Sequence, residues 1–168
     1  MRVVVNAAMS ADGKLSSRER TQVEISGPAD FDRVDELRAE SDAVMVGVGT
    51  VLADDPSLTV DSDRRRADRR ARGASANPAR VVADSRVRTP PDARVLDDAA
   101  DTYLLVAEST PTDFIEQMEA AGATVIAAGD PRVDLPEALD ALDSHGVDQL
   151  MVEGGGELIY SLFDAALV

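Results

Sequence analysis

The sequence predicts an α/β fold with a mainly parallel central sheet. Short apolar runs typical of buried strands alternate with segments whose apolar residues recur at helical spacing, as in sheets with crossover helices. The 168 residues suit one domain with a sizeable core, and a hydrophobic content of 44% argues against wholesale disorder. We therefore expect a single domain over residues 1–168.

The predicted strands are brief and rich in aliphatic residues. The first covers residues 2–8, with three consecutive valines, and the second covers 43–46, where glycines follow. Later strands are predicted at 80–84, 102–107, 124–127 and 149–153.

Helices are predicted between these strands. Pro28 behind Gly27 indicates a helix start, and the spacing of the following apolar residues extends that helix to about residue 41. A short helical turn is predicted at 50–53, and further helices at 112–121, 136–144 and 156–167. His145 should lie at a helix end, where Gly146 supplies the left-handed stop.

Residues 62–76 differ from the rest of the chain. Within 61–80 there are seven arginines, three aspartates and few apolar residues. Low apolar content cannot offset the entropy lost on ordering, so we expect an Arg-rich loop insertion that is poorly ordered.

Charge and composition exclude several classes of function. A net charge of −15 argues against nucleic acid and anionic membranes as partners. No apolar run reaches the roughly 20 residues of a membrane helix, and no signal peptide is present, so we expect a cytoplasmic protein. Lys14 is the only lysine, and an acidic, lysine-poor chain resembles proteins of a salt-rich, haloarchaeal-type cytoplasm; an ordinary acidic protein is the alternative.

The residue inventory limits the chemistry. The absence of cysteine excludes disulfides and thiolate metal sites, and a single histidine excludes a histidine-rich zinc site. We therefore expect no metal. The reaction must use carboxylates, hydroxyls, arginines, Lys14 or a bound cofactor that brings its own reactivity.

Three strand ends are followed by loops suited to a ligand, because ligands of open α/β sheets bind beyond the carboxyl ends of the strands. Residues 154–157, Gly-Gly-Gly-Glu before a helix, predict a diphosphate cradle, or alternatively a flexible turn. Residues 47–52 lack the third glycine of the Rossmann fingerprint, but Thr50 and Asp54 would share a helical face and either bind a polar ligand or cap the turn. Ser85, Arg86 and Arg88 could meet the ribose phosphate of an adenosine.

Five segments together resemble the pyrimidine reductases of riboflavin biosynthesis, whose fold is like that of dihydrofolate reductase. They are NAAMSADGK (6–14), ELRAESDA (36–43), GTVLADDPSLTV (49–60), NPARVVADS (77–85) and MVEGGG (151–156). Their order and rough spacing are right, and they span the whole chain.

The resemblance implies an NADPH-dependent reduction of 2,5-diamino-6-ribosylamino-4(3H)-pyrimidinone 5′-phosphate, whose ribose becomes a ribityl chain when hydride reaches C1. It also places two groups of residues in the site. Those expected to face NADPH are Ala8, Thr50, Asp54, Ser85, Gly155, Gly156 and Glu157. Those expected to face the substrate are Arg38, at its phosphate, Leu58 and Glu153, with Asp12 and Lys14 in a loop near the reacting centre.

Two departures and two alternatives stand beside this resemblance. The resemblance implies further residues past the final helix and a homodimer. Because this sequence ends at Val168, we expect a C-terminally truncated form as one reading, and dimerisation stays open. Asp61 also stands where bacterial relatives often have arginine. The alternatives are a dihydrofolate reductase proper, disfavoured by only 3% aromatic residues, and a non-catalytic nucleotide-binding module.

Overall fold

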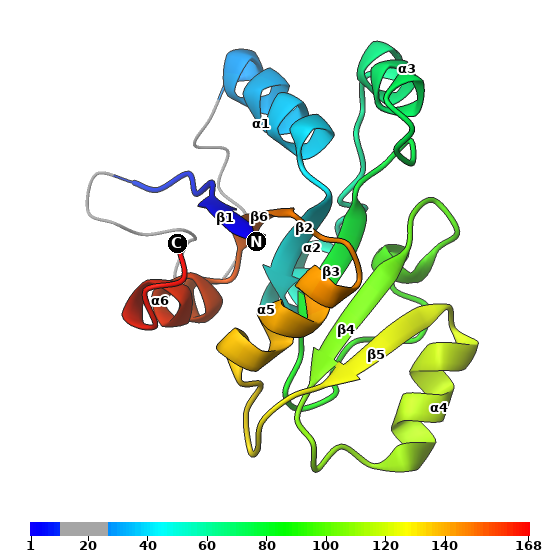
Figure 1. The fold of residues 1–168 in the computed structure, drawn as a ribbon, viewed down its shortest axis with the longest axis vertical. Coiled ribbons are helices and arrows are strands. Elements are labelled where there is room, and N and C mark those ends of the chain that lie inside the picture. The colour runs from blue at the N-terminus through cyan, green and yellow to red at the C-terminus, as the bar shows by residue number, and fades with distance from the viewer. Residues whose placement is uncertain (11–26) are drawn as a thin grey trace.

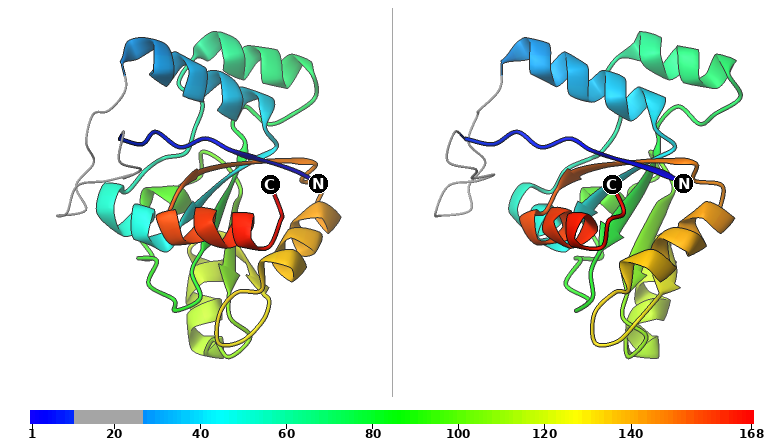
Figure 2. Two further views of the ribbon diagram at one scale, coloured as in Figure 1. Left: turned by 90° about the vertical axis from the view of Figure 1, so that its left-hand side faces the viewer. Right: turned by 60° about the vertical axis from the view of Figure 1, so that its left-hand side comes forward.

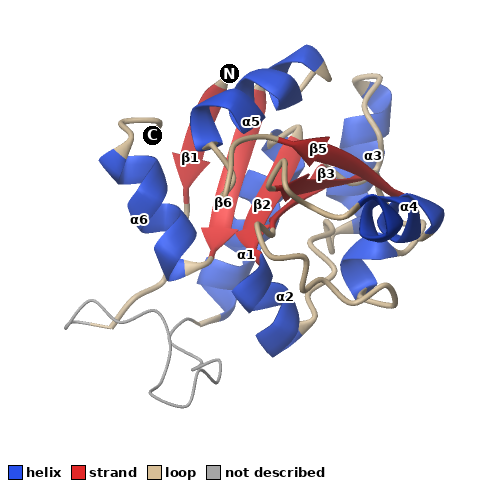
Figure 3. Ribbon diagram, turned by 90° about the horizontal axis from the view of Figure 1, so that it is seen from below, coloured by secondary structure: helices blue, strands red, loops and turns tan. Residues whose placement is uncertain are grey.

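The computed structural model describes residues 1–10 and 27–168. These residues form one six-stranded sheet in the order β1-β6-β2-β3-β4-β5, and every neighbouring pair is parallel. The strands are β1 (Arg2–Val5), β2 (Ala43–Gly47), β3 (Ala79–Ala83), β4 (Thr102–Val106), β5 (Ala123–Ala127) and β6 (Gln149–Gly154). The predicted α/β fold with a mainly parallel sheet is therefore confirmed, and Figure 3 shows β1, β6 and β2 pointing the same way.

The helices connect the strands close to the predicted positions. They are α1 (Pro28–Glu40), α2 (Val48–Asp54), α3 (Asp63–Ala71), α4 (Thr112–Ala120), α5 (Leu135–Ser144) and α6 (Gly156–Asp164), with one 3₁₀ turn at Arg94–Leu96. The predicted turn at 50–53 is the centre of α2, and His145 follows α5 with Gly146 at φ 86°, as expected. No helix within the described residues combines the length and hydropathy needed to cross a bilayer.

Alternate side chains of the buried strands face two separate cores. Met45, Val81 and Leu105 pack with residues of α5 and α6 on one face of the sheet. Val46 and Val82 pack on the other face with residues of α2 and α4. In Figure 1, α5 lies in front of the sheet and α2 behind it, so both faces are covered as a parallel sheet requires.

The structure of the Arg-rich segment differs from the prediction. Residues 63–71 form helix α3 instead of a poorly ordered loop, and α3 lies beside α1 in both views of Figure 2. Arg65 Nη1 lies 2.8 Å from a carboxylate oxygen of both Asp32 and Asp35 on α1. The Asp35 side chain is 8% exposed and also accepts from the backbone N–H groups of Asp61 and Ser62. Low apolar content misled the prediction because ion pairs and hydrogen bonds, rather than apolar burial, attach this helix.

Arg69 of α3 completes the end of α1. It is 4% exposed, and its Nη1 donates to the carbonyl oxygens of Ala39 at 2.9 Å and Ser41 at 2.7 Å, while its Nε donates to the carbonyl of Ser75 at 2.9 Å. The last carbonyls of a helix have no partner within the helix, so a buried guanidinium is a favourable cap. Through this contact α3 fixes the C-terminal turn of α1.

We expect Arg69→Met to destabilise the protein by about 3 kcal/mol or more, because buried carbonyls would lose charged donors. Urea unfolding at fixed salt measures the change. Arg70→Met is the matched control, because Arg70 is the exposed neighbour and its replacement should stay within about 0.5 kcal/mol of the parent. Equal stability of the two variants would contradict the capping role of Arg69.

Candidate functional site

A cavity of about 1200 Å³ lies at the carboxyl ends of the parallel strands. The segments that follow β1, β2, β3, β5 and β6 contribute to its lining, and one face of α1 adds Asp30, Phe31, Val34 and Arg38. Parallel strands bring these segments to one edge of the sheet although they are far apart in sequence. The volume exceeds the roughly 300–1,000 Å³ of a typical ligand pocket, so the cavity has room for two small molecules.

The junction of β6 and α6 forms one wall and explains the glycine run. Gly155 has φ 97°, and a Cβ atom there would lie 3.0 Å from the backbone nitrogen of Gly47. A Cβ on Gly154 would lie 2.9 Å from Thr50 Oγ1. Gly155 is therefore required by the close approach of this junction to the start of α2, and Gly154 packs tightly against the Thr50 side chain, which argues against the flexible turn considered from the sequence.

The first turn of α6 opens onto this cavity. Gly156, Glu157 and Leu158 all line it, and no side chain of the described residues caps the N-terminus of the helix. The first backbone N–H groups of a helix have no intrahelical partner and suit an anion. Thr50 and Asp54 of α2 also line the cavity, as their shared helical face predicted.

A buried carboxylate shapes the loop after β3. Asp84 is fully buried, and its Oδ2 accepts from Arg88 N at 2.6 Å, Thr89 N at 2.7 Å and Thr89 Oγ1 at 2.7 Å. These bonds close the loop around Val87, which adopts a left-handed φ of 59°. Ser85, Arg86 and Arg88 line the cavity from this loop.

Arg38 and Glu153 form a bidentate ion pair in the cavity wall. Arg38 Nε lies 2.8 Å from Glu153 Oε2, and Arg38 Nη2 lies 2.6 Å from Glu153 Oε1. Arg38 Nη1 donates to the carbonyl of Thr59 at 3.0 Å, and the paired side chains are 17% and 11% exposed. Burial opposes the charge of Arg38, but the hydrogen bonds and charge of Glu153 outweigh it and raise the pKa of Arg38 above its ordinary value. Two residues expected to face the substrate thus bind each other. One N–H group on Nη1 and one on Nη2 of Arg38 are not used in these hydrogen bonds.

The structure brings most of the predicted site residues together. The cavity is lined by Ala8, Arg38, Thr50, Asp54, Ser85, Glu153, Gly155, Gly156 and Glu157. Leu58 is not brought to it: its side chain is 1% exposed and packs in the core with Val46 and Val82. Asp12 and Lys14 lie outside the described residues.

Several lining residues were not predicted from the sequence, and Asn6, Phe31 and Arg132 are the three whose side chains add most to the chemistry of the cavity. Asn6 directly follows β1, but the predicted strand extended to residue 8, so the sequence did not mark Asn6 as a strand end. Arg132 is the only lysine or arginine between residues 95 and 168, which was a usable signal. Phe31 carried no signal beyond its helical spacing.

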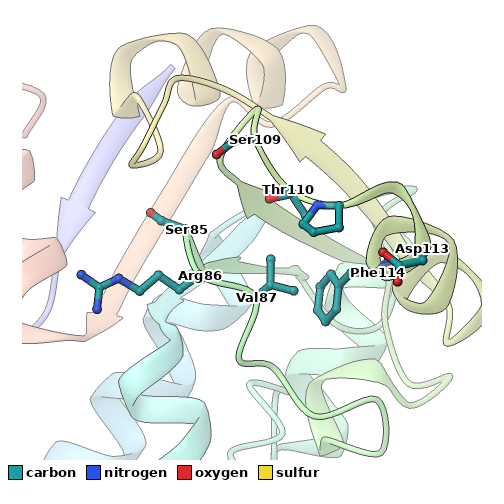
Figure 4. Close-up of a pocket in the computed structure, with 8 residues that line it drawn as sticks. Ser85, Arg86, Val87, Ser109, Thr110, Asp113 and Phe114 are labelled. Carbon is teal, nitrogen blue, oxygen red and sulfur yellow. The ribbon is translucent and has the colours of Figure 1, made fainter.

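A second pocket of about 360 Å³ adjoins the cavity and shares Ser85 and Arg86 with it. Figure 4 shows the ring of Phe114 beside Val87, while the Arg86 side chain extends away from Phe114. Ser109 and Thr110 add hydroxyls to the lining, and the hydroxyl of Thr110 is buried without a hydrogen-bond partner among the described residues. Apolar walls with a few polar groups suit a flat heterocyclic ring.

The arginines of the described chain divide into two groups. Ten of them make a side-chain ion pair or hydrogen bond with a described residue, namely Arg2, Arg33, Arg38, Arg64, Arg65, Arg66, Arg69, Arg72, Arg80 and Arg94. Among the described arginines the other four are Arg70, Arg86, Arg88 and Arg132, and the last three line the cavity. In a chain with a net charge of −15, guanidiniums left without a carboxylate around one cavity indicate a site for anions.

Comparison with known proteins agrees with this geometry. The sequence matches the family described as the RibD C-terminal domain over residues 1–168. It is 49% identical to the 2,5-diamino-6-ribosylamino-4(3H)-pyrimidinone 5′-phosphate reductase of Archaeoglobus fulgidus, covering 99% of this chain and 75% of that protein. The reductase of the same name from Methanothermobacter thermautotrophicus is 47% identical, with 99% and 73% covered.

A solved structure has the same fold. It is the diaminohydroxyphosphoribosylaminopyrimidine deaminase/5-amino-6-(5-phosphoribosylamino)uracil reductase of Thermotoga maritima, with a TM-score of 0.76 and 26% identity. The match covers 98% of this chain and 42% of that one, so this chain spans less than half of the Thermotoga protein.

We expect Gly155→Ala to destabilise the protein by about 1–3 kcal/mol, because a side chain at φ 97° is strained and its Cβ would press on Gly47. Thermal unfolding without ligand measures the effect. Gly49→Ala is the control: a Cβ at Gly49 meets no described atom within 4 Å, and alanine favours the helix there. If the two variants unfolded at the same temperature, the junction of β6 and α6 would not be constrained as described.

Proposed function

Because the chain belongs to the RibD C-terminal domain family, we propose that it reduces 2,5-diamino-6-ribosylamino-4(3H)-pyrimidinone 5′-phosphate to its ribityl form with NADPH. One observation carries the proposal: the glycine junction of β6, the start of α6 and three arginines that have no side-chain partner among the described residues meet in one cavity. A reductase of this family requires a nicotinamide cofactor, and a dinucleotide with several phosphates suits those groups.

The residues of the cavity fit NADPH in separate places. The N–H groups of Gly156 and Glu157 at the start of α6 would hold the diphosphate, and the absence of a side chain at Gly155 lets the backbone approach it. Thr50, Asp54 and Ala8 would border the rest of the dinucleotide. Ser85 and the arginines beside it would meet the phosphate on the adenosine ribose, and the pocket of Val87 and Phe114 would hold the adenine.

The remaining wall is proposed to hold the substrate. Arg38 offers the substrate phosphate the N–H groups that Glu153 and Thr59 leave over, and Glu153 fixes the plane of that guanidinium. Leu58 would act only through the packing beneath the site.

Bound NADPH would supply the hydride that ribose C1 accepts in an open-chain imine form, and a proton would go to the imine nitrogen. The chain's own part is to orient the two molecules and to exclude water, which together can lower a barrier by several kcal/mol. Asp12 and Lys14 follow β1, whose end borders the cavity, and we keep both as the proposed polar groups near the reacting centre.

The proposal extends to the setting of the enzyme. The single lysine and net charge of −15 favour a cytoplasm rich in salt, and the family resemblance favours a homodimer as the active form. Nucleic acids and membranes are not proposed as partners, because a strongly acidic chain repels both.

Oxidation of NADPH, followed by its absorbance, tests the reaction. We expect turnover with the ribosylaminopyrimidine phosphate and none with dihydrofolate. Turnover with dihydrofolate alone would favour a dihydrofolate reductase, and turnover with neither, in high salt, would favour a non-catalytic nucleotide-binding module.

We expect Arg38→Ala to raise KM strongly, with a smaller fall in kcat, because the phosphate lies far from the ribose C1 and contributes mainly binding and positioning. Arg38→Lys should recover part of the loss, since an ammonium cannot reproduce the planar fork. Steady-state kinetics measure the changes in KM and kcat. The affinity for NADPH is measured alongside and should barely change.

Two controls accompany that measurement. Glu153 is 11% exposed and loses its partner in Arg38→Ala, so the fold of the variant is checked by thermal unfolding. Substrate without its 5′-phosphate is the second control. If Arg38→Ala raised KM for both substrates by the same factor, Arg38 would not bind the phosphate.

We expect NADPH to bind at least about tenfold more tightly than NADH, because each charge-assisted hydrogen bond from Arg86 or Arg88 contributes about 1.5–3 kcal/mol. Ser85 can add a further donor, since its Oγ accepts from Val133 N at 3.0 Å and its own O–H is left over. Fluorescence titration of both cofactors measures the ratio, and equal affinities would refute the assignment of this loop.

A further inference from the structure

Arg132 lies on the loop between β5 and α5 and lines the same cavity as Ser85, Arg86 and Arg88. We propose that Arg132 is a specificity-determining residue that binds the phosphate on the adenosine ribose of the cofactor, opposite the loop after β3. The inference rests on the proposed function, because it names a further residue for the same cofactor.

The loop after β5 reaches across the end of β4 to the loop after β3. In the sheet, β4 lies between β3 and β5. Val133, next to Arg132, nevertheless donates its backbone N–H to Ser85 Oγ at 3.0 Å. This bond joins the two loops and brings Arg132 to the loop that carries the predicted phosphate-binding residues.

The loop after β5 is held by its own backbone. Asp134 N donates to Ala128 O at 3.0 Å, and Glu108 N donates to Gly129 O at 2.8 Å. Gly129 has φ 69°, and a Cβ there would lie 2.7 Å from Asp134 Cβ, so only glycine permits the turn. Asp134 also caps α5 by accepting from Glu137 N at 3.0 Å. A loop closed this tightly presents Arg132 in a restricted region, which lowers the entropy lost on binding.

The charges around the cavity favour an anion at this end. Its lining carboxylates, Asp30, Asp54, Glu153 and Glu157, come from α1, α2, β6 and α6. None comes from the loops after β3 and β5, whose lining charges are the guanidiniums of Arg86, Arg88 and Arg132. None of these three has a side-chain partner in the part of the chain that the structure describes, so they are available to a doubly charged phosphate monoester.

The neighbouring pocket indicates which phosphate this is. The ring-sized pocket of Val87 and Phe114 shares Ser85 and Arg86 with the cavity. A phosphate held by Arg86 and Arg132 would thus lie next to a bound ring, as the 2′-phosphate of an adenosine does. The substrate phosphate is instead assigned to Arg38 on α1.

The test compares Arg132→Gln with the parent and with Arg70→Gln. Arg70 also lacks a side-chain partner among the described residues, but it lies on α3 and does not line the cavity. We expect Arg132→Gln to weaken NADPH binding about tenfold or more and to leave NADH binding nearly unchanged. Arg132→Lys should keep part of the preference for NADPH over NADH, and Arg70→Gln should keep all of that preference.

Titration with adenosine 2′,5′-bisphosphate and with AMP gives a second readout that needs no turnover. Arg132→Gln should weaken the binding of the bisphosphate and leave the binding of AMP nearly unchanged. Its thermal unfolding should match the parent's, because the exposed Arg132 side chain makes no hydrogen bond or ion pair with a described residue.

The outcomes separate this inference from the proposed function. Suppose that the parent protein prefers NADPH. If Arg132→Gln kept the full preference, or if the variant lost affinity for NADPH and NADH equally, the role of Arg132 would be overturned while the proposed function stood. If the parent bound neither cofactor, both would be overturned.

Discussion

The insertion of β6 between β1 and β2 is the constraint on which the rest of the molecule depends. Residues 149–154 enter the sheet next to its edge strand, pairing with Val3–Val5 on one side and with β2 on the other. The glycines after β6 then come within contact distance of Gly47 and Thr50 at the start of α2. Because that approach leaves no room for side chains, the cavity wall on this side is backbone, and the same packing that stabilises the sheet exposes N–H groups to a ligand.

Arginine serves two distinct purposes in this acidic protein. Arg65 and Arg69 attach α3 to α1 through carboxylates and carbonyl oxygens, and Arg38 ties α1 to β6 through Glu153. These guanidiniums act as structural ties between elements that share little apolar surface. Those on the loops after β3 and β5 have no such partner among the described residues and remain available to anions. The distinction follows from position: these ties lie where α1 meets α3 and β6, and the available guanidiniums of the cavity follow strand ends.

The sequence predicted the strands well because each is a short aliphatic run whose burial on both faces leaves little ambiguity. It also identified most of the cavity, since glycines and polar residues after strands meet at one edge of a parallel sheet. It failed at α3, where a helix attached by ion pairs has no apolar face to detect. For Leu58 the sequence could not indicate that the side chain packs into the core. The Arg38–Glu153 pair could not be foreseen either, because 115 residues separate its members and only the folded sheet joins them.

The edge position of β1 has a consequence for the order in which the fold can form during synthesis. Among the described strands β1 pairs only with β6, and the hydrogen bond from Arg2 to Gln149 spans 147 residues. A nascent chain therefore emerges from the ribosome with its first apolar strand unpaired, and β2, β3, β4 and β5 are all made before the partner appears. Contacts of such long range close slowly, and an open aliphatic edge is prone to pair with other chains meanwhile. The described sheet and the ligand cavity thus cannot be completed before residues 149–157 have been made.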